Sequence, residues 1–123
     1  MKASRAGEII HCTFITTTTK MDGKVVVLIS VDNYSDYCFG VAVEKDMLFS
    51  EVLKHIAGIL KDVHKNHPGV KPLFLMAYGN KMLEELEIQF KGKASFLFNP
   101  TLADERAMPA AKSLMEKLFP KKK

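Results

Sequence analysis

The stretch IIHCTFI, residues 9–15, places a histidine and a cysteine side by side in an apolar, β-branched run. His11 and Cys12 are the residue types that a nucleophilic site or a metal site could use. In an extended strand, neighbouring side chains point to opposite faces, so His11 cannot act as the base for Cys12. The two side chains must therefore lie on opposite faces of the strand, and the helices and strands packed on each face decide what they contact.

Two other groups of residues could also do chemistry. His64 and His67 form an H-x-x-H pattern near a predicted helix end, but two ligands are weak evidence for zinc, and we expect surface histidines there. Tyr78 could attack DNA only among several cationic groups, and the chain has two arginines, Arg5 and Arg106. Neither group predicts an enzyme by itself.

The composition indicates one globular domain. The chain has 123 residues, of which 47% are hydrophobic, enough to build a core. It contains no apolar run of membrane-spanning length and no apolar signal core near its start, so we expect a cytoplasmic protein. Both cysteines, Cys12 and Cys38, lie in apolar runs and are expected to be buried thiols.

The net charge gives only faint support for nucleic-acid binding. It is +4, and removing the tail residues Lys121, Lys122 and Lys123 leaves +1. We therefore expect any contact with DNA to involve this tail.

The hydrophobic pattern predicts an α/β domain. Three strands joined by turns are predicted first, at residues 9–19, 24–31 and 36–43. Helices and short strands then alternate: a helix capped by Ser50, a strand at 72–78, a helix at 81–90, a strand at 94–98, and a last helix with Pro109 in its first turn.

This β-β-β-α-β-α-β-α order predicts a mixed five-stranded sheet with helices on its faces. The 24–31 strand should lie between the other two strands of the first half. The 9–19 strand should pair in parallel with the 72–78 strand at the centre of the sheet.

The stretch VLISVDNYSDYCFGVAV, residues 27–43, resembles the second and third strands of the retroviral-type integrase and transposase core. That core is a ribonuclease H-like fold of the DDE superfamily, in which an apolar strand leads into Asp-x-Tyr/Phe-Ser and then into Gly-x-Ala-Val. The matching residues here are Asp32, Tyr34, Ser35, Gly40, Ala42 and Val43. The resemblance implies an N-terminal extension at 1–7, a core-like domain at 8–119 and a basic tail at 120–123.

The same resemblance implies three metal-binding carboxylates, but His11, Tyr78 and Ala110 stand near their places. Such carboxylates hold two Mg²⁺ or Mn²⁺ ions about 3.5–4 Å apart. Asp104 and Glu105 precede the third place by one turn and are the possible substitute acids. We expect a bound metal only if the register is shifted toward them; otherwise a neutral His11 should contact Tyr78.

The resemblance thus implies a catalytically inactive integrase-core-like domain of a mobile genetic element. Its role would be DNA binding, oligomerisation or accessory function, with partners that are weakly bound DNA, a second copy of the chain, or a transposase or integrase subunit. Two alternatives stay open: an unrelated small α/β protein-interaction module, and an active metal-dependent nuclease with displaced acids.

Overall fold

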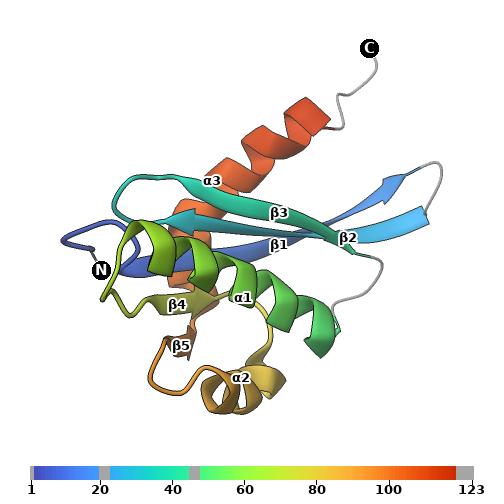
Figure 1. Cartoon of the computed structure of the whole chain (residues 1–123). Coiled ribbons are helices and arrows are strands. Elements are labelled where there is room, and N and C mark those ends of the chain that lie inside the picture. Colours follow the sequence, from blue (N-terminus) through green and yellow to red (C-terminus); the bar gives the residue numbers. More distant parts are fainter. Residues whose placement is uncertain (1, 20–22, 45–47, 119–123) are drawn as a thin grey trace.

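The computed structural model describes residues 2–19, 23–44 and 48–118 (Figure 1). In chain order the elements are β1 (Ile9–Thr19), β2 (Gly23–Asp32), β3 (Cys38–Glu44), α1 (Phe49–Asn66), β4 (Leu73–Met76), the 3-10 helix η1 (Asn80–Met82), α2 (Leu83–Gln89), β5 (Ser95–Phe98) and α3 (Pro100–Leu118). Within this described part, no helix has the length and apolar character needed to cross a membrane.

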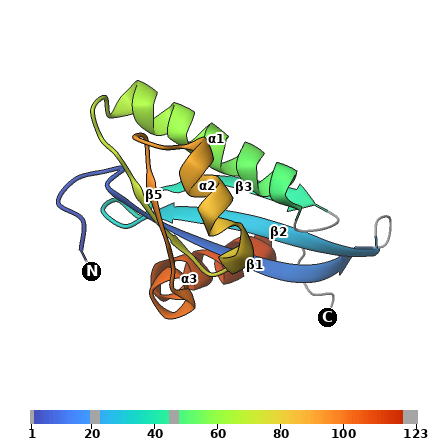
Figure 2. The same cartoon turned by 90° about the horizontal axis from the view of Figure 1, so that it is seen from below.

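The five strands form one mixed sheet in the order β3-β2-β1-β4-β5. The first three strands are antiparallel neighbours, whereas β1 and β4 pair in parallel, as do β4 and β5. The predicted α/β class is confirmed, and so are the middle position of β2 and the parallel pairing of β1 with β4 at the centre. The sheet lies between α3 on one face and α1 with α2 on the other (Figure 2).

The side chains of β1 divide between the two faces. Ile10 and Cys12 belong to the core beneath α1 and α2, whereas His11 and Thr13 each form a hydrogen bond with a residue of α3. The alternation follows from the pleat of a strand. As a result, the adjacent polar residues of the opening run lie in separate layers.

Helix α3 packs closely on the sheet because its buried stripe is made of small residues. Ala103, Ala107 and Ala111 are fully buried and follow one another at a spacing of four residues. That spacing places them on one face of a helix. A larger side chain at any of these positions would push the helix away from β1 and β2.

The start of α3 corrects the prediction that placed Pro109 in the first turn. The helix begins at Pro100, and Pro109 lies inside it. Asn99 caps this start, since its side-chain Oδ1 accepts a hydrogen bond of 3.1 Å from the Leu102 N–H. A capping residue followed by proline is a stronger start signal than a proline alone.

Two other predictions of local structure were wrong. Helix α1 begins at Phe49 after Leu48, with no side-chain cap, so Ser50 is not its cap. Strand β3 begins at Cys38 because a turn precedes it, in which Asp36 adopts a φ of 60° and the Asp32 N–H donates to the Tyr37 carbonyl. Cys38, the first residue of this strand, is exposed, so the prediction that it is buried was wrong; Cys12 is buried as predicted, and the two form no disulfide.

These starts predict different effects of two alanine substitutions. Asn99→Ala should lower the free energy of unfolding by about 1 kcal/mol, because it removes the cap of α3. Ser50→Ala should change it by less than about 0.5 kcal/mol, because Ser50 is an exposed helical residue without a capping role. Urea denaturation of both variants measures the difference, and equal losses would contradict the assigned helix starts.

Candidate functional site

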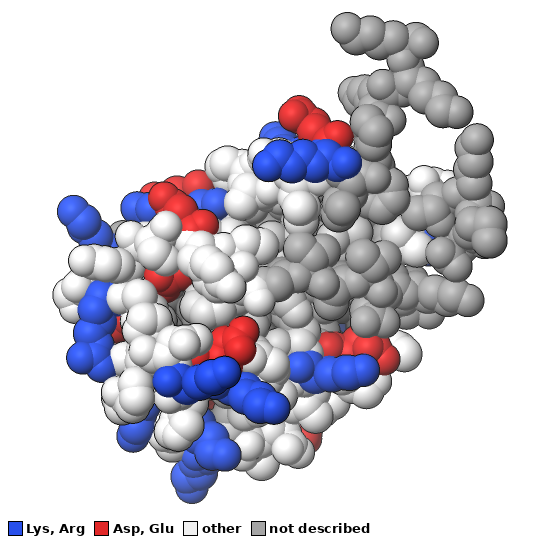
Figure 3. All heavy atoms as spheres, turned by 45° about the horizontal axis from the view of Figure 1, so that its top comes forward, with Lys and Arg blue, Asp and Glu red and all other residues white. Residues whose placement is uncertain are grey.

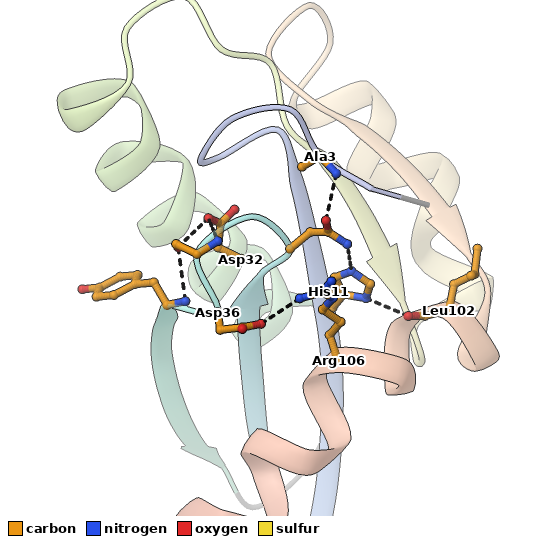
Figure 4. Close-up of polar contacts among 9 residues, drawn as sticks. Ala3, His11, Asp32, Asp36, Leu102 and Arg106 are labelled. Carbon is orange, nitrogen blue, oxygen red and sulfur yellow. Dashed lines mark hydrogen bonds and ion pairs between the residues drawn. The ribbon is translucent and has the colours of Figure 1, made fainter.

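His11 lies on the central strand and forms hydrogen bonds through both ring nitrogens (Figure 4). Its Nδ1 is 2.7 Å from the backbone oxygen of Leu102, and its Nε2 is 2.8 Å from the Nδ2 of Asn33. A carbonyl oxygen can only accept and an amide nitrogen can only donate, so the ring is the neutral tautomer with its proton on Nδ1. Burial lowers the pKa of His11, although the hydrogen bond to the Leu102 carbonyl acts in the opposite direction.

The network continues from Asn33 into the N-terminal segment. The Oδ1 of Asn33 accepts a 2.8 Å hydrogen bond from the backbone N–H of Ala3, whose side chain is buried. Ala3, which belongs to the expected N-terminal extension, therefore packs on this site. Gly7 approaches α1 so closely that an added Cβ would lie 3.1 Å from Val63, and its φ of 82° also favours glycine.

Asp32 organises the turn that follows β2. Its Oδ1 accepts from the Gly7 N–H at 2.9 Å, and its Oδ2 accepts from the N–H and the hydroxyl of Ser35 at 3.1 and 2.6 Å. The Asp-x-Tyr-Ser stretch thus forms an Asx-type turn, with Tyr34 exposed. Asp32 itself is buried, so these hydrogen bonds hold its carboxylate in a structural role.

The acids at the start of α3 are placed differently from one another. The Thr13 hydroxyl donates a 2.6 Å hydrogen bond to Asp104, which joins α3 to β1. Glu105 is exposed and lines a shallow hollow together with Arg106 and Ala110. Of the two possible substitute acids, Asp104 is the one with a side-chain contact to the central strand.

The expected contact between His11 and Tyr78 is absent. Tyr78 belongs to the core beneath α1, where its ring meets Phe14 edge-on at 6.0 Å. Its hydroxyl is buried without a hydrogen-bond partner among the described residues, and burial raises its pKa well above 10. Ala77, one residue earlier, packs beside Leu75 and therefore shares the side of the sheet that His11 faces.

The residues around His11 do not fit the pair of divalent ions that the resemblance implies. Mg²⁺ requires oxygen ligands, usually carboxylates. Here the two ring nitrogens of His11 and both oxygens of Asp32 have hydrogen-bond partners. Across residues 2–19, 23–44 and 48–118, no group of three or more His, Cys, Asp or Glu side chains could hold a metal ion.

A second polar cluster, which the sequence did not suggest, lies beneath α1. The Ser30 hydroxyl donates to the Cys12 sulfur at 3.3 Å and is 2.9 Å from the Nε2 of His55. These are nucleophile and base types, but Cys12 and Ser30 are fully buried, and burial raises the pKa of Cys12 to about 12. An inaccessible, protonated thiol is a structural group. His55 lies three residues after the buried Val52 and four before the buried Ile59, and this helical spacing was the signal that it faces the core.

The remaining predicted residues do not join either cluster. His64 is exposed and His67 is half-buried near the end of α1. Lys121, Lys122 and Lys123 lie outside the described residues.

No family model and no curated protein matches the chain. Among solved structures, it is similar to a chain of the cryo-EM structure of the simian T-cell lymphotropic virus intasome in complex with PP2A regulatory subunit B56 gamma. The TM-score is 0.65 at 15% sequence identity, over 97% of this chain and 43% of that one. The chain thus spans less than half the length of its structural neighbour, and at this identity the likeness shows a shared fold.

The His11 geometry predicts that His11→Asp destabilises the domain. The change removes the Nδ1–H donor and places a carboxylate against the Leu102 carbonyl, which should cost roughly 1–3 kcal/mol in the free energy of unfolding. His11→Gln, which keeps a donor and an acceptor, should lose less. Thermal melts with and without Mn²⁺ provide the measurement. A rise in the melting temperature of His11→Asp on adding Mn²⁺ would contradict the conclusion that the residues around His11 do not fit a divalent ion.

The cluster beneath α1 predicts a loss of stability in mild acid. Burial lowers the pKa of His55 to about 4 from an ordinary 6.5, so the unfolded chain takes up this proton first. The stabilisation is complete above pH 6.5 and is lost as the pH falls toward 4, by up to roughly 3 kcal/mol.

His55→Gln should therefore flatten the dependence of unfolding free energy on pH between 6.5 and 4. His64→Gln, which changes an exposed histidine of the same helix, should keep the wild-type dependence. Urea denaturation at a series of pH values compares the variants, and parallel curves for wild type and His55→Gln would refute the assignment.

Proposed function

We propose that this chain is a ribonuclease H-like, integrase-core-type domain of a mobile genetic element whose metal site has been replaced by a buried hydrogen-bond network. It acts without catalysis, as a DNA-binding or accessory subunit. The observation that carries this proposal is the closed network of His11, Asn33 and Leu102 at the central strand. It occupies the place where the resemblance puts the first metal-binding carboxylate.

The strand order supports the fold part of the proposal. The antiparallel β1, β2 and β3 are followed by β4 and β5 in parallel, with β1 and β4 side by side. The Asp32 turn provides a structural reason for the Asp-x-Tyr-Ser stretch on which the resemblance rests. The chain also shares its fold with a chain of a viral intasome complex, which supports a role inside an assembly with other subunits.

The geometry of the acids supports the non-catalytic part. A metal shared between β1 and the chain after β4 needs ligands on one side of the sheet. On the side that His11 faces, the residue after β4 is Ala77, which offers no ligand atom, and Tyr78 lies on the other side. Of the two substitute acids, Asp104 is already bound by Thr13, and Glu105 is exposed.

This proposal predicts no nicking of supercoiled plasmid by the purified chain in the presence of Mn²⁺. Gel electrophoresis of the plasmid provides the assay, with the double variant Asp104→Asn, Glu105→Gln run beside the wild type. Metal-dependent nicking that the double variant loses would identify an active nuclease with displaced acids. Nicking that the double variant retains would contradict both the inactive domain and the nuclease that uses Asp104 and Glu105.

The proposal also predicts weak binding of duplex DNA without sequence preference. Outside the Lys tail the net charge is only +1, so few counterions should be released and the dependence of affinity on salt should be shallow. Deleting Lys121, Lys122 and Lys123 should remove most of the affinity in a fluorescence-anisotropy titration. Tight binding by the shortened chain at physiological salt would contradict the role assigned to the tail.

A further inference from the structure

A groove of about 470 Å³ opens on the face opposite α3, between the C-terminal half of α1 and the loops that lead into β4 and β5. Figure 2 shows the α2–β5 loop reaching toward this end of α1. Leu60, Val63, Val70 and Phe90 line the groove. These four side chains also pack on the core beneath α1, so the groove has a fixed apolar floor.

Three lysines from three different segments form the rim: Lys61 on α1, Lys71 before β4 and Lys93 before β5. All three are exposed, and none of the lining residues within the described chain is acidic. Asp62, the acid next to Lys61, lines a different hollow beside Asn66. Figure 3 shows Lys and Arg side chains along the left and lower border of its face, with Asp and Glu side chains among them. The groove therefore combines an apolar floor with a positive rim.

The shape of the groove fits a helical segment. Its α1 wall runs from Ala57 to His64, which at 1.5 Å per residue is about 10 Å, or roughly two turns of a bound helix. Gly69 and Gly92 lie along the loop walls with left-handed backbone, and a Cβ added to either would meet nothing within 4 Å. Small residues on both walls leave room for an inserted side chain.

We propose that this basic groove, with its floor of Leu60, Val63, Val70 and Phe90 and its three rim lysines, docks an acidic amphipathic helix of a partner protein. Apolar side chains of the partner, spaced three and four residues apart, fill the floor, and carboxylates on both flanks pair with Lys61, Lys71 and Lys93. The inference specifies the accessory role proposed above, but its evidence is the groove alone. The outcome of the plasmid and DNA experiments therefore does not decide it.

The floor favours a peptide over a nucleic acid. Single strands bind where exposed aromatic rings stack on bases and where arginines contact phosphates. Among the described lining residues Phe90 is the one Phe, Tyr or Trp, and it is half-buried; the imidazole of His64 is the other ring, and no arginine is among them. An apolar floor between separate lysines suits leucine-type side chains flanked by carboxylates.

The experiment selects peptides from a random displayed library against the full chain and measures their affinity by fluorescence anisotropy. Enriched peptides should be acidic, with apolar residues at i, i+4 and i+7. The triple variant Lys61→Glu, Lys71→Glu, Lys93→Glu should weaken their binding roughly tenfold or more. The matched control Lys24→Glu, Lys112→Glu, Lys117→Glu, which reverses three exposed lysines elsewhere, should bind as the wild type does.

Ala57→Arg separates shape from charge, because it adds a positive charge while filling the groove. Binding should fall if apolar side chains must insert, and a rise would show a purely electrostatic contact and overturn the proposal. Enriched peptides that bind the triple groove variant and Ala57→Arg as tightly as the wild type would also overturn it. So would an oligo-dT probe that binds the wild type, competes with the peptides and is lost in the triple groove variant.

Discussion

The fold depends on satisfying a histidine at the centre of an otherwise apolar sheet. His11 is buried on β1, where each ring nitrogen must find a partner or weaken the fold. Its partners come from distant parts of the chain, Leu102 at the start of α3 and Asn33 directly after β2, and Asn33 in turn accepts a hydrogen bond from Ala3. One neutral imidazole thereby fixes how three segments meet the central strand.

Other buried polar side chains also find hydrogen-bond partners, and these partners differ between the two faces of the sheet. On the α3 side, Thr13 pairs with Asp104, and on the α1 side Ser30 joins Cys12 to His55. These hydrogen bonds let the polar side chains remain inside the sheet at a small net cost in folding free energy. The described exception is the hydroxyl of Tyr78, which is buried without a partner. Polar residues in this sheet therefore act chiefly as connections between layers.

Because this end of the sheet is closed by internal contacts, the recognition that we propose lies at the surface. The N-terminal segment covers the His11 network, and the turn at Asp32 uses its carboxylate internally. The basic groove lies across the sheet from α3, on a floor that the core already holds in place. Its lysines point into solvent, where they can pair with a partner without disturbing the hydrogen bonds of the interior.

The sequence by itself determined the local features, because strand alternation, helical spacing and turn residues act over a few neighbours. It predicted the strands, their order, and the separation of His11 from Cys12. It misplaced the start of α3 because Pro109 was preferred to the capped Pro100, and it paired His11 with Tyr78. Tertiary structure decided the actual partners: Leu102 and Asp104 are each 91 residues from the strand residue they bind. Contacts at that separation depend on sheet register and on how α3 docks, which no local pattern encodes.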